Sequence, residues 1–424
     1  MRILFLQKRL LYPSNTGGKI RTLNVLRHLA SWHDVTYLCN IQPDEQPHAH
    51  DMERLGVKLI AVPWNEARRR SVRFAGSAIR NLLSPCPFNV DKDYNPELRQ
   101  RAAEIVSSAA CDLLVCDFVQ MARNCLGLKI PKLLFQHNVE CEIFRRQSMR
   151  ASGLWSRYLG SQAGKMERFE KLAGNDFDRI IAVSERDRKE FQKLYGWNHV
   201  DVIDTAVDVD YFSPDPSSSR VSNQVVFIGS MDWPPNVEGV HHFVNKIWPL
   251  VVRENPDARF QIVGRNPSES VWKLAAIPGI EVTGTVKDTR PFLQSAAVSV
   301  VPVYSGSGTR LKIFESMAMM CPVVSSPLGA EGLDVEHNQH VLLCEDDRAM
   351  ATGINRLLTD PQEAHRISKH ALELVRERFT TERVARQFEL SCKKTIAAWR
   401  MERSGQVNSE AFLPGSFTGT NPDE

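Results

Sequence analysis

Two successive series of short apolar, β-branched segments place the strongest constraint on how this chain can fold. The first series is RILFLQ, DVTYLC, VKLIAV, DLLVCDF, KLLFQHN and RIIAVSE, and the second starts after about residue 222 with QVVFIGSM, RFQIVG, IEVTGTV, VSVVPVY, PVVSS and HVLLCE. Segments that are apolar on both faces and alternate with helical spacing are typical of parallel strands in doubly wound sheets. The sequence therefore predicts an α/β fold with two Rossmann-like domains, which a length of 424 residues allows.

The boundary between the two domains is expected in the stretch TAVDVDYFSPDPSSSRVSNQ, which is rich in Pro, Ser and Asp and has little periodic apolar pattern. We predict an N-terminal domain over residues 1–212, a linker over 213–222 and a C-terminal domain over 223–380. A helix over 381–402 is expected to close the fold, with the N-terminal domain as one surface on which it could pack. The polar tail 403–424 is expected to be disordered.

Composition excludes several classes of protein. A formal net charge of +3 with 24% charged residues argues against a nucleic-acid partner. The nine cysteines form no C-x-x-C pair, and several lie in strand-like segments, which favours reduced thiols and a cytoplasmic setting. The opening MRILFLQKRLLYP fits a buried first strand better than a signal peptide. No segment approaches the roughly 18 apolar residues of a membrane span, so any membrane contact is expected at a surface.

The stretch GSGTRLKIFE, residues 306–315, has the composition of an anion-binding strand-to-helix junction. Its glycines relieve the backbone, Thr309 is a suitable N-cap, and a helix N-terminus after such a loop presents free N–H groups to an anion. Arg310 and Lys312 add positive charge, which suits phosphate, and Glu315 accepts hydrogen bonds and so suits a diol such as ribose. An ordinary strand-loop-helix unit with solvent-facing cations is the alternative.

GTRLKIFESMAMMCPVVSSPLGAEGL resembles the C-terminal signature of the family 4 retaining glycosyltransferases, which have the GT-B fold. The resemblance extends in order to FIGSMDWPPNVEGVHHF, FQIVGRNP, VTGTVKDTRPFLQSA, IIAVSERDRKEF, VIDTAVDVDYF and SNTGGKIRTLNVLRHLA, and it covers most of residues 1–390. It implies a nucleoside-diphosphate sugar bound mainly by the C-terminal domain and an acceptor on the N-terminal domain. Transfer would take place in the cleft between them.

The resemblance also implies a donor site residue by residue. Glu315 matches the glutamate that holds the donor ribose, Ser307 to Leu311 match the loop that meets the diphosphate or sugar, and Gly284 to Val286 match the segment beside the base. The expected donor-binding residues are Gly17, Gly18, Gly229, Ser230, Asn236, Arg265, Gly284, Val286, Ser307, Gly308, Thr309, Arg310, Leu311, Lys312 and Glu315.

The sequence departs from the family pattern at three positions. Ser307 stands where a second glutamate is usual, and Ser230 and Asn236 stand where an Arg and a Lys often neutralise the diphosphate. We hypothesise that Arg310 and Lys312 supply this charge from the opposite side of the pocket. We assign both cations to catalysis, together with His137 and Glu315.

In the N-terminal domain, TGGKIR is not a nucleotide-triphosphate loop, because Ile20 follows the lysine and Pro13 stands where the first glycine would be. It resembles the glycine loop of the family, so Gly17 and Gly18 are expected to contact the donor. A simple loop before a helix is the alternative.

FQHNVE places His137 at the carboxyl end of a strand, where doubly wound folds have their sites. The family has a histidine near here that touches the transferred sugar, whereas a lone histidine is more often a satisfied polar residue. Glu140 is a candidate for acceptor binding or for the role of base.

Neither a metal nor another cofactor is expected. The acidic DVD at residues 208–210 falls in the segment that matches the family's interdomain NGVD pattern, and no His/Cys cluster offers metal-ligand spacing. Charge neutralisation would then come from cations and helix N-termini.

Two basic stretches with interleaved apolar residues, NEARRRSVRFAGSAIRNLLS and IFRRQSMRASGLWSRYLGSQAGK, lie in the N-terminal domain. They fit amphipathic helices on an anionic bilayer, with Arg68 to Arg70 as contacts, at the inner face of the cytoplasmic membrane. Solvated helices are the alternative. The expected function is transfer of a sugar to a hydroxyl acceptor, either a glycan or a polyprenyl-linked glycan, in bacterial exopolysaccharide assembly. A nucleotide-sugar epimerase and a non-catalytic nucleotide- or glycan-binding subunit are the alternatives.

Overall fold

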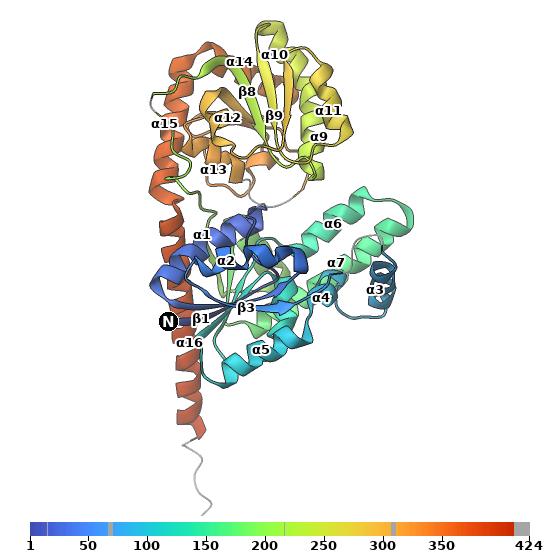
Figure 1. Cartoon of the computed structure of the whole chain (residues 1–424), viewed down its shortest axis with the longest axis vertical. Coiled ribbons are helices and arrows are strands. Elements are labelled where there is room, and N and C mark those ends of the chain that lie inside the picture. The colour runs from blue at the N-terminus through green and yellow to red at the C-terminus, as the bar shows by residue number, and fades with distance from the viewer. Residues whose placement is uncertain (15, 67–70, 216, 307–310, 411–424) are drawn as a thin grey trace, which may run out of the picture.

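The computed structural model describes residues 1–14, 16–66, 71–215, 217–306 and 311–410. The described chain forms two parallel sheets, each covered by helices on both faces (Figure 1). The predicted α/β fold with two Rossmann-like sheets is confirmed. We call the first sheet with its helices the N-terminal domain and the second the C-terminal domain.

The N-terminal sheet has the strand order β3-β2-β1-β4-β5-β6-β7, and all its neighbours pair in parallel. Its strands are β1 (Arg2–Gln7), β2 (Asp34–Ile41), β3 (Lys58–Pro63), β4 (Leu113–Asp117), β5 (Lys132–Phe135), β6 (Arg179–Ala182) and β7 (Val200–Val202). The order reverses between β1 and β4, so their carboxyl ends diverge and leave a crevice, which is where doubly wound sheets bind ligands.

The C-terminal sheet has the strand order β10-β9-β8-β11-β12-β13 and is also parallel. Its strands are β8 (Val221–Ile228), β9 (Arg259–Val263), β10 (Ile280–Gly284), β11 (Ala296–Val301), β12 (Val323–Ser325) and β13 (Leu342–Leu343). Here the order reverses between β8 and β11. The expected linker over 213–222 overlaps β8, which is the first strand of this sheet along the chain and begins at Val221.

Helices cover both sheets. In the first half these are α1 (Gly17–Trp32), α2 (Ala49–Glu53), α3 (Val72–Leu82), α4 (Phe88–Asp93), α5 (Pro96–Ser107), α6 (Glu140–Arg150), α7 (Gly153–Asp176) and α8 (Glu185–Tyr195). The second half has α9 (Pro234–His242), α10 (Trp248–Glu254), α11 (Glu269–Trp272), α12 (Arg290–Ser295), α13 (Leu311–Ala318), α14 (Asp347–Thr359), α15 (Pro361–Arg378) and α16 (Thr381–Glu410). Short 3-10 turns lie at Pro43–His48, Val119–Asn124, Lys273–Ala276 and Leu328–Ala330, and a π-helical turn lies at Phe243–Ile247.

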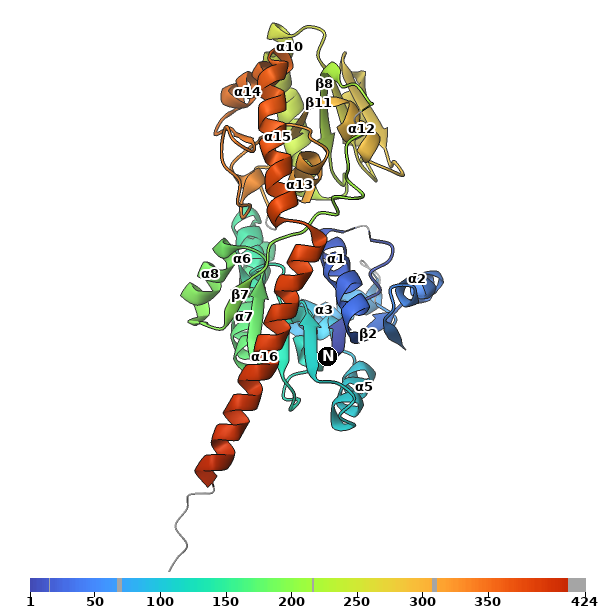
Figure 2. The same cartoon turned by 90° about the vertical axis from the view of Figure 1, so that its left-hand side faces the viewer.

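The last helix, α16, crosses from the C-terminal domain and runs down the length of the N-terminal domain (Figures 1 and 2). Val384, Phe388 and Cys392 are buried in the same apolar cluster as strands β1 and β2, and the Phe388 ring lies 5.1 Å from that of Phe135. Each such buried side chain contributes about 1.5–3 kcal/mol, so α16 is an integral part of the N-terminal core. Residues 403–410, expected in a disordered tail, belong to this helix, while 411–424 lie outside the described residues.

Candidate active site

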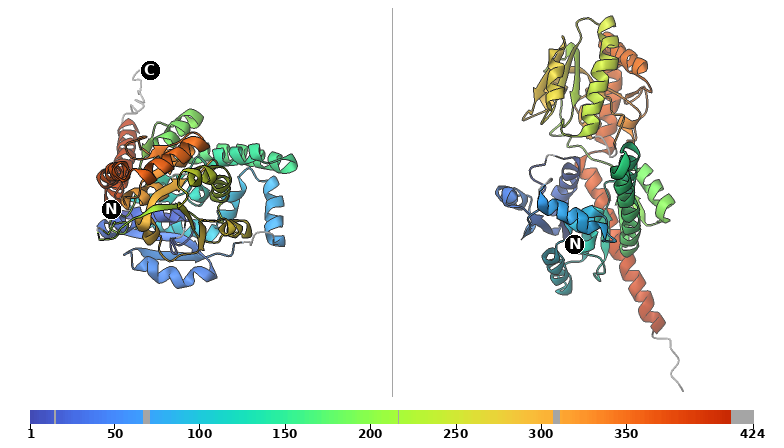
Figure 3. Two further views of the ribbon diagram at one scale, coloured as in Figure 1. Left: turned by 90° about the horizontal axis from the view of Figure 1, so that it is seen from above. Right: turned by 90° about the vertical axis from the view of Figure 1, so that its right-hand side faces the viewer.

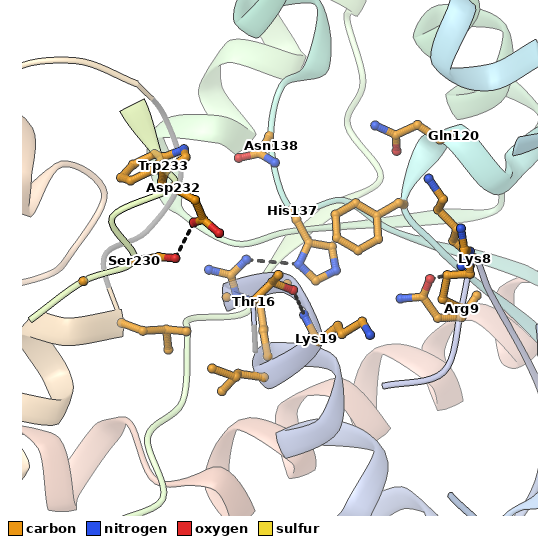
Figure 4. Close-up of a pocket in the computed structure, with 18 of the residues that line it drawn as sticks. Lys8, Arg9, Thr16, Lys19, Gln120, His137, Asn138, Ser230, Asp232 and Trp233 are labelled. Atoms are coloured by element: carbon orange, nitrogen blue, oxygen red, sulfur yellow. Dashed lines mark hydrogen bonds between the residues drawn. The ribbon is translucent and has the colours of Figure 1, made fainter. Parts of the chain in front are cut away.

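A cavity of about 850 Å³ lies between the carboxyl ends of the two sheets (Figure 4). Its N-terminal wall contains Gln7, Lys8, Arg9, Leu10, Thr16, Gly17, Gly18, Lys19, Ile20, Arg21, Asn89, Lys92, Asp93, Phe118, Gln120, Met121, His137 and Asn138. Its C-terminal wall contains Ile228, Gly229, Ser230, Asp232, Trp233, Asn236, Arg265, Leu311, Lys312 and Glu315. Because both walls are formed at strand ends and helix starts, one ligand could contact both domains.

The histidine predicted from the sequence lies at the centre of a buried polar network. His137 Nε2 is 2.6 Å from Asp117 Oδ1, and His137 Nδ1 is 3.0 Å from Arg21 Nη1. Arg21 also donates from Nε and Nη2 to Thr205 Oγ1, at 3.0 and 2.8 Å. Because Arg21 can only donate, Nδ1 of His137 must accept, and the ring proton must lie on Nε2 and point at Asp117.

Burial determines the charge states in this network. It lowers the pKa of His137, although the neighbouring Asp117 opposes the shift, so the imidazole is neutral at physiological pH. Burial also lowers the pKa of Arg21 to about 10, against the opposing carboxylates of Asp187 and Asp117. Arg21 therefore keeps its positive charge inside the cavity wall.

Phe118, the residue after β4, holds the histidine ring from one side. Its ring stacks on His137 with centroids 3.9 Å apart and an interplanar angle of 11°. Its backbone has φ of 69°, a left-handed conformation that is strained for a bulky residue. A Cβ on Gly18 would lie 2.8 Å from the Phe118 ring, so glycine at that position is needed for the stack to form.

Gly17, by contrast, faces the other domain. A Cβ there would lie 3.6 Å from Leu311 Cδ1, at an ordinary contact distance. Leu311 is the last residue of the predicted donor loop and begins α13, whereas Ser307, Gly308, Thr309 and Arg310 of that loop lie outside the described residues. Thr16 caps α1 by accepting from the Lys19 N–H. The start of α1 and the start of α13 thus approach each other across the cavity.

Lys312 projects from α13 toward the carboxyl end of β8 in the C-terminal wall. Its Nζ donates to Asn236 Oδ1 at 3.0 Å and lies 4.2 Å from the centre of the Phe227 ring. A Cβ on Gly229 would lie 2.7 Å from the same Nζ, so the glycine leaves room for the ammonium group. The lysine thus brings positive charge to the place where Asn236 replaces the family's cation.

A second cation, Arg265, lies beside the segment that follows β8. Arg265 Nε donates to Ser230 Oγ at 2.7 Å and stands 3.9 Å from Asp232 Oδ2. Asn236 Nδ2 donates to the Ser230 carbonyl oxygen at 2.9 Å. Serine at position 230 therefore anchors an arginine from the loop that follows the neighbouring strand β9.

Glu315 lies one helical turn into α13 and lines the same cavity. Its burial raises its pKa to about 7, against the opposing charge of Lys312. Within the part of the chain that the structure describes, its carboxylate has no hydrogen-bond or ion-pair partner. An acceptor of this kind, open to a cavity, is suited to a ligand that brings hydroxyl donors.

Three predicted residues do not line the cavity. Gly284 ends β10 with φ of 70°, close to the Trp272 ring, and Val286 packs against a separate apolar cluster. Glu140 is buried at the start of α6, where it accepts from Asn138 Nδ2 at 3.3 Å, and burial raises its pKa. Only Asn138 of this pair reaches the cavity.

An ion pair and a hydrogen bond join the two domains. Arg186 Nε lies 3.2 Å from Glu331 Oε1, and Arg146 Nη1 donates to the Gly306 carbonyl oxygen at 3.1 Å. Arg146 is on α6, whereas Gly306 immediately precedes the predicted donor loop. The position of α6 is therefore linked to the start of that loop.

Sequence reasoning did not identify Arg21, Asp117, Phe118 or Thr205. Asp117 is the last residue of β4 and the penultimate residue of the segment DLLVCDF, and a carboxylate at the carboxyl end of a buried strand was the one available signal. Among the described residues, no group of three His, Cys, Asp or Glu side chains could hold a metal ion. None of the described helices has the length and apolar character needed to cross a bilayer.

The two facing sheets and the cavity between them define a two-domain protein of the GT-B type. The family described as Glycosyltransferase Family 4 matches residues 16–211, and the family described as Glycosyl transferases group 1 matches residues 222–360. The chain belongs to the family 4 (group 1) glycosyltransferases and is an enzyme of that class.

Two bacterial relatives are distant in sequence. A Klebsiella pneumoniae protein described as an uncharacterized 44.6 kDa protein in the cps region is 22% identical over 389 residues, which cover 88% of this chain and 95% of that protein. The phosphatidyl-myo-inositol mannosyltransferase of Mycobacterium leprae is 28% identical over 216 residues, 49% of this chain and 55% of the relative.

Solved structures share the fold. HepE of Anabaena, in complex with UDP and glucose, has a TM-score of 0.66 at 14% identity, covering 93% of this chain and 100% of HepE. WaaG, a glycosyltransferase involved in lipopolysaccharide biosynthesis, has a TM-score of 0.62 at 13% identity, covering 90% and 98%. At these identities the likeness establishes the GT-B fold and does not extend to substrates.

Proposed function

We propose that this glycosyltransferase moves a sugar from a UDP-sugar to a hydroxyl group of a glycan or polyprenyl-linked acceptor, with retention at the anomeric carbon. The observation that carries this proposal is the carboxylate of Glu315, which has no partner among the described residues and lies beside Lys312 on one wall of the interdomain cavity. The carboxylate suits ribose hydroxyls and the ammonium suits a diphosphate. HepE, which has the same fold, was solved with UDP-glucose.

Loss of the diphosphate leaving group would be the step that the protein assists most. Negative charge grows on the leaving oxygens, and a preorganised cation in a shielded site stabilises such charge strongly. Lys312 has this position in the C-terminal wall, and Arg265 lies nearby. Arg310 and the other donor-loop residues 307–309 are proposed to add to the same site. No resident metal or organic cofactor is part of the proposal, and the nucleotide sugar is a co-substrate.

Nucleotide binding tests the donor site directly. UDP, GDP and ADP are each titrated into the full chain while its Tm is recorded, and UDP is expected to raise the Tm most. Glu315→Gln should lose most of this shift, whereas Glu269→Gln on α11, an exposed carboxylate that does not line the cavity, should keep it. No shift with any of the three nucleotides would contradict the proposal.

The acceptor reaction separates this function from its alternatives. A Klebsiella relative in a cps region supports polysaccharide assembly as the context. Incubation with UDP-sugars should release UDP faster when a hydroxyl acceptor is present. Conversion of one UDP-sugar into another without an acceptor would indicate an epimerase, and binding without any turnover would indicate a non-catalytic subunit.

We further propose that the enzyme works in the cytoplasm at the inner face of the membrane, bound through α3. The outward face of α3 and the residue after it expose Val72, Ile79, Leu82 and Leu83, while Phe74 packs on Phe88 of α4. The turn between α6 and α7 exposes Met149, Leu154 and Trp155 and projects from the same side of the domain (Figures 1 and 3). The predicted contacts Arg68 to Arg70 lie outside the described residues, directly before this helix.

Vesicle pelleting tests this surface. The full chain should pellet with anionic vesicles, and Ile79→Ser with Leu83→Ser should reduce the bound fraction, because the double variant removes two exposed apolar side chains from one helix face. Leu172→Ser, which changes an exposed leucine elsewhere on α7, is the matched control. Equal pelleting of all three proteins would place the contact elsewhere.

A further inference from the structure

One end of the cavity contains a group of cations that the donor proposal does not use. Lys8 and Arg9 follow β1, Lys19 lies in the first turn of α1, and Lys92 lies on α4. These four residues, which we call the basic end, come from three separate elements and line one part of the N-terminal wall. Figure 4 shows Lys8, Arg9 and Lys19 on the side of the cavity away from Ser230, Asp232 and Trp233.

Three carboxylates form ion pairs with the basic end, but most of them do not line the cavity. Lys8 Nζ lies 3.0 Å from Asp93 Oδ1, Lys92 Nζ lies 2.6 Å from Glu66 Oε1, and Arg9 Nη1 lies 3.0 Å from Glu45 Oε2. Of the three carboxylates, only Asp93 lines the cavity, and its side chain is just 3% exposed. The surface that a ligand meets is therefore predominantly cationic.

The basic end has more cations than carboxylates. Four cations face three carboxylates, and no carboxylate of the described residues lies within ion-pair distance of the Lys19 ammonium. Burial lowers the pKa of Lys19, and the nearby Arg9 adds to the lowering, although Glu45 opposes it. The pKa of Lys8 is likewise lowered by burial, against Asp93 and with Lys92 as a repelling neighbour. Burial is the main cause of both shifts, so an anion placed here would offset the cost of holding these ammonium groups away from water.

We infer that the basic end binds an oxyanion on the acceptor, either the phosphate of a lipid diphosphate or the carboxylate of an acidic sugar. This inference rests on the proposed transfer function, because it assigns the donor to the opposite wall. Gln120, which also lines this side, has a buried Oε1 without a hydrogen-bond partner among the described residues and is suited to a sugar hydroxyl. Lys92 lies on α4, the helix that follows α3. A lipid-linked acceptor could thus place its tail at α3 and its phosphate at the basic end.

Lys19 is the residue to test, because among the described residues it takes part in no ion pair whose loss would leave a carboxylate unpaired. Three probes are titrated into the full chain at saturating UDP: methyl glucoside, methyl glucuronide, and glucose joined through a diphosphate to a short prenyl chain. At least one anionic probe should bind about tenfold more tightly than methyl glucoside, the effect of one charge-assisted hydrogen bond. Lys19→Gln should remove most of this preference, and Lys193→Gln, an exposed lysine on α8, should not.

The UDP affinity of each variant separates this inference from the function on which it rests. If UDP fails to bind the unmodified chain, the transfer function is wrong. If UDP binds but the neutral and anionic probes bind equally, the inference fails while the transfer function stands. If Lys19→Gln weakens UDP as much as the anionic probe, Lys19 serves the donor and the inference is overturned. Preference for the prenyl diphosphate probe over the glucuronide indicates a lipid-linked acceptor, and the reverse indicates an acidic glycan.

Discussion

His137 Nε2 stands 2.6 Å from Asp117 Oδ1, and both side chains are almost completely shielded from solvent. Thr22 Oγ1 and Gln7 Nε2 each donate to the other oxygen of the carboxylate, at 2.6 Å. Asp117 therefore accepts three hydrogen bonds and donates none. This arrangement orients the imidazole and leaves Nδ1 as an acceptor that faces Arg21.

Asp117→Asn should damage turnover through the histidine tautomer. Thr22 and Gln7 require an acceptor, so the amide oxygen must face them and the amide N–H₂ must face His137. The histidine proton would then move to Nδ1 and oppose the donor of Arg21. We expect kcat to fall by about 10- to 100-fold, because a buried polar group that loses its partner costs about 1–3 kcal/mol and each ~1.4 kcal/mol is a factor of ten in rate. UDP affinity should change little, because the pair lies in the N-terminal wall. If Asp117→Asn lowers the Tm strongly but leaves kcat of the folded fraction unchanged, Asp117 has a purely structural role.

Gly17 and Gly18 offer a matched pair of substitutions. Gly18→Ala would push a methyl group to 2.8 Å from the Phe118 ring and so shift the ring that stacks on His137. Gly17→Ala would meet Leu311 Cδ1 at 3.6 Å, which is an ordinary contact. We expect Gly18→Ala to lower kcat/KM by at least about tenfold, because overpacking costs about 1–3 kcal/mol and ~1.4 kcal/mol is a tenfold change in rate. Gly17→Ala should lower kcat/KM less than about threefold. The reverse order would show that the backbone of Gly17 itself touches the substrate.

Much of the fold was predictable, because buried parallel strands leave a local signal. Segments such as RILFLQ and QVVFIGSM are apolar on both faces, and their order along the chain sets the order of domains. The length of α16 was not predictable in the same way, since polar residues beyond 402 lack an apolar stripe.

The donor wall was more predictable than the N-terminal wall. Glu315 and Lys312 lie three residues apart on one helix, so a single stretch of sequence identifies both. The histidine network instead joins Arg21 to residues 116 and 184 positions away. Arg21 also sits on a helix where an arginine would ordinarily be solvated, and only the packing of α1 against the sheet buries it. Such contacts leave no periodic trace in the sequence.

Binding of UDP-glucose should depend on pH through Glu315. Burial raises the pKa of this carboxyl to about 7, so it is mostly protonated at pH 6 and mostly ionised at pH 8. The ionised form offers one acceptor oxygen to each ribose hydroxyl, whereas in the protonated form one oxygen carries the proton, so binding should strengthen as pH rises. The expected change in Kd between these pH values is about tenfold, as for a group with one pKa midway between them. UDP-glucose has no phosphate proton that titrates near neutrality, and burial lowers the pKa of His137 below its ordinary value.

Calorimetric titration of UDP-glucose across this pH range checks the prediction. Glu315→Gln should bind more weakly and show a flat profile, because the amide does not titrate. A profile that keeps its slope in Glu315→Gln would assign the pH dependence to another group.

The ion pair between Arg186 and Glu331 should favour the closed arrangement of the two domains. Both side chains are about one-third exposed, so the pair contributes about 1 kcal/mol or less. Because the cavity is lined by both domains, Glu331→Gln should weaken UDP-glucose binding by up to about fivefold at low salt, and the difference should shrink toward about 0.5 M salt as the pair is screened. Glu363→Gln, which removes an ion pair with Arg356 inside the C-terminal domain, should leave the affinity unchanged. Equal loss in both variants, or a loss that persists at high salt, would mean that Glu331 acts on the fold of its own domain rather than on closure.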